Sequence, residues 1–359
     1  MRNNKMKLKD LGYSAFFENN RKVSGLDGFP VARVIAEHKE AYIVKNTTNE
    51  YLAKITGTQM FNASSREDYP AVGDWVAITE LDSERATIHA VLPRKTILKK
   101  KYSDKNATQV IAANIDIVFA VESVDRDYNL NRFERCLAIA KDGDIKPAII
   151  LNKIDLVSQA ELNFKITQIN NRFNGIDVIP ASTVADKGLD ELTAYITKGK
   201  TYCFLGSSGV GKSSLINKLL GTDTIKTNTI SEHTGRGKHT TSGRGMYFLK
   251  NGGIVIDNPG MREIGMTDSP SAIENVFDEI SALSKKCKFS DCTHMNEPGC
   301  AVLDAIKCNK LDKNKYSNYI KLKKEAEHYG MTELEKRRKD RKFGKFVKTA
   351  LEQLKKYKK

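Results

Sequence analysis

The chain has 359 residues and carries 59 Lys and Arg against 44 Asp and Glu, which gives a formal net charge of +15. A chain of this length can form two or three domains, each with its own core, and the basic charge favours a polyanionic partner. The charged N-terminus is unlike a secretory signal, and the longest apolar runs are too short to cross a membrane. We therefore expect a cytoplasmic protein that has no membrane partner.

The N-terminal part of the chain predicts a short extension, residues 1–28, followed by a small barrel, residues 29–100. The barrel region contains short segments of alternating apolar and polar residues separated by turn residues, a pattern typical of an all-β barrel. We expect an OB-type barrel, with an SH3-like barrel as the alternative. Trp75, the single tryptophan, could stack on a nucleic-acid base, but a lone aromatic residue in a strand more often packs in the core.

Residues 108–267 alternate between strand-like and helix-like segments. After the first expected strand, an apolar stripe at helical spacing runs from Leu130 to Ala140 and is followed by Gly143. This alternation predicts an α/β domain with helices on both faces of the sheet. The expected strands are residues 115–121, 146–151, 177–181, 201–206, 245–250 and 252–257.

The segment "NKID" follows the second of these strands and has the residues that read a guanine base. Asp155 can accept hydrogen bonds from the guanine N1–H and exocyclic amine, a donor pair that adenine lacks. Asn152 can support the base edge and the neighbouring loops, while Lys153 can lie over the base plane. Downstream, "PASTVADKGLDEL" is similar to a loop that offers a backbone N–H to guanine O6, anchored by Ser182 and continued by Thr183.

The segment "GSSGVGKSS" matches the phosphate-binding spacing G-x-x-x-x-G-K-[ST], with an apolar strand before it and a helical pattern after it. Backbone N–H groups of such a loop surround the β-phosphate, and its glycines allow angles that a Cβ forbids. Lys212 is expected to bridge the β- and γ-phosphates and to act in catalysis, and Ser213 to bind Mg²⁺. The predicted phosphate-binding residues are Gly206, Ser207, Ser208, Gly209, Val210, Gly211, Lys212, Ser213 and Ser214.

The segment "DNPG" ends the last expected strand. Asp257 can hold Mg²⁺ through water, and the N–H of Gly260 can reach the γ-phosphate. The next residue is Met261, where Ras-like enzymes have the glutamine that orients the attacking water. Because an apolar side chain cannot orient water, another group must do so.

The segment "GRGKHTTSGRG" offers that group. His239 is the candidate catalytic residue, and a histidine that faces phosphate or RNA instead is the alternative. Thr240 and Thr241 follow it as predicted GTP-binding residues, and Thr241 is expected to reach Mg²⁺ as a switch threonine.

The segment "CKFSDCTHMNEPGC" contains four metal-ligand residues: Cys287, Cys292, His294 and Cys300. A complete set of four ligands leaves no open coordination position, which indicates structural rather than catalytic zinc. Buried cysteines beside a histidine, without metal, are the alternative. Cys308 is a spare cysteine that could replace one ligand, although it lies eight residues past this complete set.

The C-terminal segment from Lys336 to Lys359 carries twelve Lys or Arg residues against Asp340 and Glu352. This run is either a solvated charged tail or a basic amphipathic helix that folds against RNA. Five apolar residues at near-helical spacing favour the helix: Phe343, Phe346, Val347, Leu351 and Leu354.

The order of these motifs, with the base-reading loop before the phosphate loop, resembles that of the circularly permuted GTPases. Residues 30–330, with "NLNRFER", "GVGKSSLIN", "NPGMRE" and "EPGCAV", resemble the RsgA family of ribosome small-subunit-dependent GTPases. The resemblance implies an OB-type barrel, a permuted GTPase domain over residues 108–267 and a zinc domain over 268–330. The charge run adds a basic tail over 331–359.

The resemblance also implies a function. It predicts a monomer that binds the small (30S) ribosomal subunit and its 16S rRNA and hydrolyses GTP to GDP with Mg²⁺ during late subunit maturation, hydrolysis being coupled to release. The alternative is an RNA-binding assembly factor for which GTP is mainly a conformational ligand. The permutation itself places the "DNPG" switch directly before the zinc domain, so nucleotide state can change domain geometry.

Overall fold

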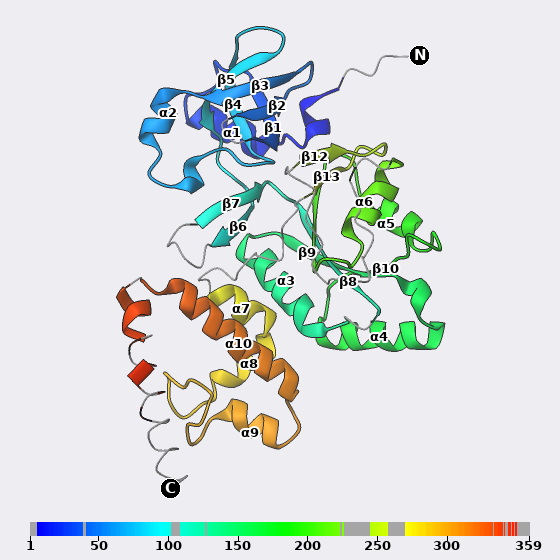
Figure 1. Ribbon diagram of the computed structural model, residues 1–359, viewed down its shortest axis with the longest axis vertical. Coiled ribbons are helices and arrows are strands. Elements are labelled where there is room, and N and C mark those ends of the chain that lie inside the picture. The colour runs from blue at the N-terminus through cyan, green and yellow to red at the C-terminus, as the bar shows by residue number, and fades with distance from the viewer. Residues whose placement is uncertain are drawn as a thin grey trace. The chain divides into compact units, whose positions relative to one another are not determined.

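The computed structural model describes residues 6–38, 41–101, 108–125, 128–222, 225, 245–257, 270–332, 334–339, 341, 344–345, 347 and 349 (Figure 1). The chain folds as two compact units. The first unit contains the barrel and the α/β sheet, and the second contains the C-terminal helices.

A closed five-stranded barrel follows the N-terminal segment. Its strand order is β1-β2-β3-β5-β4, with β4 pairing back to β1 and β3 running parallel to β5. This order and the short helix α2 (Gly57–Asn62) between β3 and β4 are those of an OB-type barrel, so that expectation is confirmed and the SH3-like alternative is wrong. The strands are β1 (Val31–Glu37), β2 (Tyr42–Lys45), β3 (Glu50–Ile55), β4 (Trp75–Glu80) and β5 (Arg85–Val91).

The N-terminal segment packs against this barrel as a 3-10 turn, Leu8–Leu11, and helix α1, Ala15–Val23. Its apolar residues cover Trp75, which is completely buried and meets the ring of Tyr13 edge to face at 4.7 Å. The prediction that Trp75 packs in the core is therefore confirmed.

Arg33 on β1 connects the N-terminal segment, the barrel and the start of the α/β sheet. Its buried guanidinium donates hydrogen bonds to the carbonyls of Leu11 at 2.5 Å, Gly73 at 3.2 Å and Asn114 at 3.1 Å. Burial lowers the pKa of Arg33 to about 10, which still leaves it charged at neutral pH. One side chain thus satisfies buried carbonyls from three chain segments, and the Gly73 carbonyl also accepts from Asn114 Nδ2 at 3.1 Å.

The second sheet has the order β10-β9-β8-β11-β13-β12, parallel except for β12. All six expected strands are present, with ends that differ by up to two residues, and β12 also pairs with β1 of the barrel at Ala36 and Gly245. The strands are β8 (Ile117–Ser123), β9 (Lys146–Asn152), β10 (Val178–Pro180), β11 (Thr201–Leu205), β12 (Gly245–Phe248) and β13 (Ile254–Asp257).

Helices cover both faces of this sheet, as predicted. One face packs through Phe119 and Ile150 against α5 and α6, and the opposite face packs through Val118 and Cys203 against α3. The helices are α3 (Leu130–Asp142), α4 (Gln159–Arg172), α5 (Leu189–Tyr195) and α6 (Lys212–Leu220), and a separate two-stranded sheet consists of β6 (Ile97–Lys101) and β7 (Thr108–Ala113).

The C-terminal unit is helical around the cysteine-rich segment. The rings of Phe277 and Tyr319 meet at 5.5 Å in its core. Its helices are α7 (Pro270–Val276), α8 (Asp278–Ser284), α9 (Ala301–Lys307) and α10 (Lys313–Gly330). Of the predicted basic helix, the described residues 336–339, 341, 344–345, 347 and 349 are helical, and Phe343, Phe346, Leu351 and Leu354 lie outside the described residues. Within the described chain, no helix is both long and apolar enough to span a membrane.

Candidate functional site

The predicted nucleotide loops meet at one edge of the parallel sheet. Strands β9, β10, β11 and β13 run in the same direction, and each is followed at its carboxyl end by one of the predicted segments. Ligands of open α/β sheets bind at this edge. The fold therefore gathers loops that the sequence places up to a hundred residues apart.

The phosphate loop lies between β11 and α6, with Val210 buried and the rest of the loop partly or fully exposed. Lys212 is the first residue of α6, and its Nζ donates to the carbonyls of Gly206 at 2.8 Å and Ser207 at 2.7 Å. The ammonium group is thus held over the loop, beside the N-terminus of α6 where Ser213 and Ser214 follow. A positive charge at a helix N-terminus creates a site for phosphate.

Asn152 joins the base-reading loop to the phosphate loop. Its side chain is completely buried, and Nδ2 donates to the carbonyl of Val210 at 2.7 Å across 58 residues of sequence. Gly211 permits this approach, because a Cβ there would lie 2.3 Å from Asn152 Nδ2 and its φ of +95° disfavours other residues. The two loops therefore form one structural unit.

Lys153 has a left-handed backbone conformation, with φ of +60°, and its side chain is about one-quarter exposed. Its Nζ forms an ion pair with Asp125 at 3.0 Å, and Ser123 Oγ donates to the same carboxylate at 2.8 Å. Sequence reasoning did not single out Asp125. Its position just beyond the carboxyl end of β8 could have indicated a role, since ligands of open α/β sheets bind at the carboxyl ends of the strands.

Asp155 and Ser182 are brought together from β9 and β10. Ser182 Oγ donates a short hydrogen bond to Asp155 Oδ1 and accepts from the backbone N–H groups of Val184 and Ala185. One carboxylate oxygen of Asp155 is thereby fixed in position. Thr183 lies next to this contact in the same turn.

Asp257 is the last residue of β13 and is nearly buried, at 8% exposed. It ends a strand next to β11, which leads into the phosphate loop. Four further predicted site residues, His239, Thr240, Thr241 and Gly260, and also Met261, lie outside the described residues.

The four predicted metal ligands also come together. Cys287, Cys292, His294 and Cys300 place their ligand atoms within 4.8 Å of one another. Cys287 Sγ lies 3.9 Å from Cys300 Sγ and 3.6 Å from His294 Nδ1. Zinc–sulfur bonds of about 2.3 Å in a tetrahedron require sulfur atoms about 3.8 Å apart. The cluster therefore has the spacing of a tetrahedral metal site.

The surroundings of His294 suit a metal ligand. Burial, with a contribution from Lys323, lowers the pKa of its imidazole, which favours the neutral form that binds metal. Tyr316 Oη donates to the His294 carbonyl at 2.6 Å and fixes the turn. The spare cysteine, Cys308, is exposed and lies outside the cluster.

Comparisons with known proteins identify the family. The protein-family model described as RsgA GTPase matches residues 91–267. The small ribosomal subunit biogenesis GTPase RsgA 2 of Lactiplantibacillus plantarum is 39% identical over 320 residues, covering 89% of this chain and 90% of the relative. This chain belongs to the RsgA GTPase family. It is accordingly a GTPase, and its base-reading loop precedes its phosphate loop in the permuted order that the sequence indicated.

Another member of the family and two solved structures are also similar to this chain. RsgA 1 of Bacteroides thetaiotaomicron is 37% identical and covers 97% of both chains. The crystal structure of YjeQ from Thermotoga maritima, at 26% identity, has a TM-score of 0.62 and covers 82% of this chain and 98% of its own. The structure of YloQ, described as a circularly permuted GTPase, has a TM-score of 0.59 at 23% identity and shows the same fold over 84% of this chain and 96% of its own.

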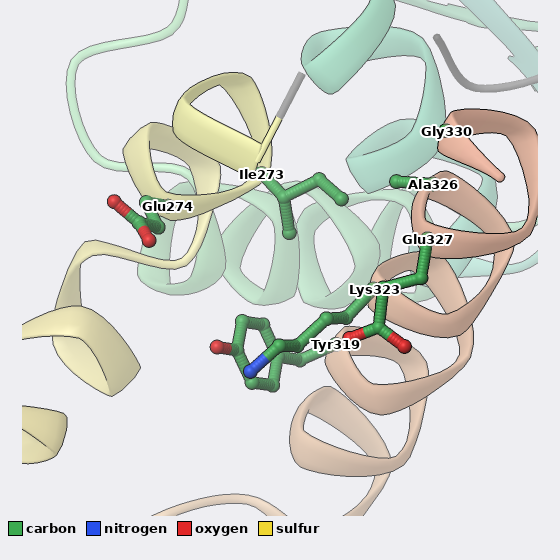
Figure 2. A pocket seen from close by; sticks show the side chains of 7 residues that line it. All are labelled: Ile273, Glu274, Tyr319, Lys323, Ala326, Glu327 and Gly330. Carbon is green, nitrogen blue, oxygen red and sulfur yellow. The ribbon is translucent and has the colours of Figure 1, made fainter. Parts of the chain in front are cut away.

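A separate pocket of about 220 Å³ lies in the C-terminal unit between α7 and α10 (Figure 2). Ile273 and Ala326 form apolar parts of its lining, while Glu274, Lys323 and Glu327 place charged groups around it. Of the predicted site residues that the structure describes, none lines this pocket.

We predict that Asp155→Asn changes base specificity. Replacing the carboxylate removes the acceptor for two guanine donors, which is expected to weaken GTP binding by about 1 to 3 kcal/mol. Xanthosine triphosphate should bind the variant better than GTP, because its 2-oxo group accepts from the new amide. Titration calorimetry with both nucleotides measures this, and Asp190→Asn, which changes an exposed carboxylate on α5, is the matched control. Unaltered GTP affinity in Asp155→Asn would remove Asp155 from the base site.

Proposed function

We propose that this GTPase binds the small ribosomal subunit through its 16S rRNA and hydrolyses GTP to GDP and phosphate during late subunit maturation, with hydrolysis coupled to release. The observation that carries the proposal is the Asn152–Val210 hydrogen bond, which joins guanine-reading and phosphate-binding loops in one site. The names of the relatives, small ribosomal subunit biogenesis GTPases, support the choice of partner.

The proposed roles in nucleotide binding follow the geometry of the loops. Asp155 accepts from the guanine edge, Lys153 covers the base, and Ser182 and Thr183 form the loop that faces O6. The backbone from Gly206 to Ser214 surrounds the phosphates. The hydrogen bonds that Lys212, Asn152 and Ser182 already make support these roles, since they hold the loops in position.

The proposed Mg²⁺ ligands are Ser213, Thr241 and Asp257. Asp257 supports this assignment because its nearly buried carboxylate ends the strand beside the phosphate loop. Gly260 and Thr240 contact the γ-phosphate in this proposal. The bound ion neutralises the charge that develops on the phosphates during transfer.

His239 is the proposed water-positioning residue. Met261 replaces the Ras-like glutamine, so the attacking water requires a different partner. The imidazole of a histidine can accept a proton from water and so act as a general base.

We further propose one structural zinc ion per chain, held by Cys287, Cys292, His294 and Cys300. The distances of 3.5 to 3.9 Å among the ligand atoms of Cys287, His294 and Cys300, with all four ligand atoms within 4.8 Å of one another, support zinc because they suit a tetrahedron of thiolate and imidazole ligands. The protein acts as a cytoplasmic monomer in this proposal, with residues 1–28, 29–100, 108–267, 268–330 and 331–359 as its successive parts.

The GTPase activity in the presence of small subunits tests the proposed function. We expect multiple-turnover GTP hydrolysis to rise by at least about tenfold when purified small subunits are added, since positioning one proton-transfer group contributes about a hundredfold or more. Large subunits serve as the control and are expected to have no such effect. An unchanged slow rate would support the alternative, an RNA-binding assembly factor for which GTP is a conformational ligand.

His239→Ala tests the catalytic assignment in the same assay. The variant should bind GTP and small subunits as the wild type does but lose most of the subunit-stimulated rate. His38→Ala, which changes an exposed histidine next to the barrel strand β1, is the control. Full stimulation of His239→Ala would assign water positioning to a group supplied by the subunit.

Elemental analysis tests the metal assignment. Protein purified without chelator should contain one zinc per chain, Cys300→Ser should contain much less, and Cys308→Ser, outside the cluster, should retain it. Zinc removal is expected to unfold the C-terminal unit but leave GTP binding intact, because binding energy of structural zinc contributes directly to folding. Metal-free wild-type protein with a fully folded C-terminal unit would contradict a structural role.

A further inference from the structure

A cleft of about 360 Å³ lies in the first unit, at the edge of the α/β sheet opposite the nucleotide loops. Asp116 precedes β8, Lys146 begins β9 and Lys200 precedes β11, so the cleft borders the amino ends of these strands. Lys146 and Asn152 lie at opposite ends of β9, which separates the cleft from the base-reading loop by about 20 Å at 3.3 Å per residue. The cleft is therefore distinct from the GTP site.

Five lysines from four separate chain segments line this cleft, which we call the lysine cleft: Lys9, Lys95, Lys146, Lys198 and Lys200. Two carboxylates, Asp116 and Asp144, share the lining. Bringing ammonium groups together costs electrostatic free energy, because like charges repel. Folding alone therefore does not favour this arrangement. This convergence indicates an anionic ligand.

The N-terminal segment forms one fixed wall of the lysine cleft. Arg33 holds its backbone through the carbonyl of Leu11, and Tyr13 packs against buried Trp75. At Gly199 a Cβ would lie 2.7 Å from the carbonyl oxygen of Lys9, so the segment packs closely on the turn before β11. The backbone that carries Lys9 is thus positioned before any ligand binds.

The lysines of the cleft can reach a ligand at little cost. Lys198 pairs with Asp10 at 2.9 Å, Lys200 with Asp116 at 2.7 Å and Lys146 with Asp177 at 3.3 Å, and each of these lysine side chains is more than half exposed. The Lys146–Asp177 pair is exposed at both partners, and such a pair contributes about 0 to 1 kcal/mol, so phosphate can replace this carboxylate. The carboxylates of Asp10 and Asp116 are less exposed, but their lysine partners remain open to solvent.

Lys9 and Lys95 are both exposed, and no carboxylate of the described residues lies within ion-pair distance of either. Their charges are therefore directly accessible to an anion.

We propose that the lysine cleft binds the phosphodiester backbone of RNA, an inference that rests on the proposed binding to the small ribosomal subunit. Small-molecule pockets are mostly apolar with a few fixed polar groups, whereas this cleft carries ammonium groups on long exposed stems. Ammonium groups act as point charges and suit a chain of repeated phosphates without base recognition. RNA bound there lies on the side of the sheet away from GTP.

Two double variants of the full chain test this proposal with a non-hydrolysable GTP analogue saturating the nucleotide site, because hydrolysis is proposed to be coupled to release. Lys9→Gln/Lys95→Gln removes two charges from the cleft, and Lys54→Gln/Lys250→Gln removes two exposed charges elsewhere in the first unit. The dissociation constant for purified small subunits is measured over a salt series. The cleft variant should bind about tenfold more weakly at about 0.1 M salt, and the slope of log K against log salt should fall by about 1.4 to 1.8, since each phosphate contributes 0.7 to 0.9.

The control variant should retain the wild-type slope, and both variants should retain the basal GTPase rate and the urea midpoint of the wild type. Equal weakening of both variants would assign the effect to net charge and overturn the proposal.

A second experiment measures the binding of fluorescent polyuridylate by the same variants. It distinguishes an error in the proposed cleft from an error in the proposed function. If the wild type binds no small subunits, the proposed function fails, while the cleft still predicts weaker polyuridylate binding by Lys9→Gln/Lys95→Gln than by the control. Equal polyuridylate binding by the two variants would overturn the cleft. Displacement of the RNA by inorganic pyrophosphate at the same phosphate concentration would instead identify a site for small phosphate ligands, which also contradicts the proposal.

Discussion

The hydrogen bond from Asn152 to the carbonyl of Val210 joins two predicted nucleotide-binding loops that lie 58 residues apart. It forms because β8 lies between β9 and β11, so the loops that follow β9 and β11 end on the same edge of the sheet. The bond depends on this spatial order and not on which loop comes first in the chain. A permuted sequence can therefore assemble the same site as an unpermuted one.

The permutation changes what lies next to the site in sequence. Strand β13, which ends at Asp257, precedes the "DNPG" switch, and the chain then continues into α7 of the C-terminal unit. Strand β12 follows the segment that contains His239 and pairs with β1 of the barrel. One predicted switch segment is thus joined covalently to the C-terminal unit, and the other leads into a strand that pairs with the barrel. We expect these connections to carry the effect of nucleotide state to both flanking parts of the protein.

Much of the fold could be predicted because its signals are local. Six apolar strands, the glycine spacing of the phosphate loop and the spacing of three cysteines and a histidine each lie within a short segment. The burial of Trp75 could also be expected from local sequence, because a lone aromatic residue in a strand usually packs in the core.

Features that depend on tertiary contacts could not be predicted. Arg33 reads as an ordinary strand residue until the carbonyls of Leu11, Gly73 and Asn114 converge on it. The same holds for the Asp125–Lys153 pair and for the lysine cleft, whose residues come from segments more than a hundred residues apart. The expectations for His239, Thr240, Thr241 and Gly260 remain predictions, because these residues lie outside the described part of the chain.

The affinity of Asn152→Ala for GDP tests most directly whether the two loops act as one site. Removing the amide leaves the Val210 carbonyl without its buried donor, and a lost buried hydrogen bond costs about 1 to 3 kcal/mol. GDP affinity should fall by about tenfold or more, although the substitution is made in the base-reading loop. The affinity for GDP should fall by a larger factor than the affinity for GMP, because only GDP carries the β-phosphate that the phosphate loop surrounds. GDP and GMP affinities both equal to those of the wild type would contradict the account.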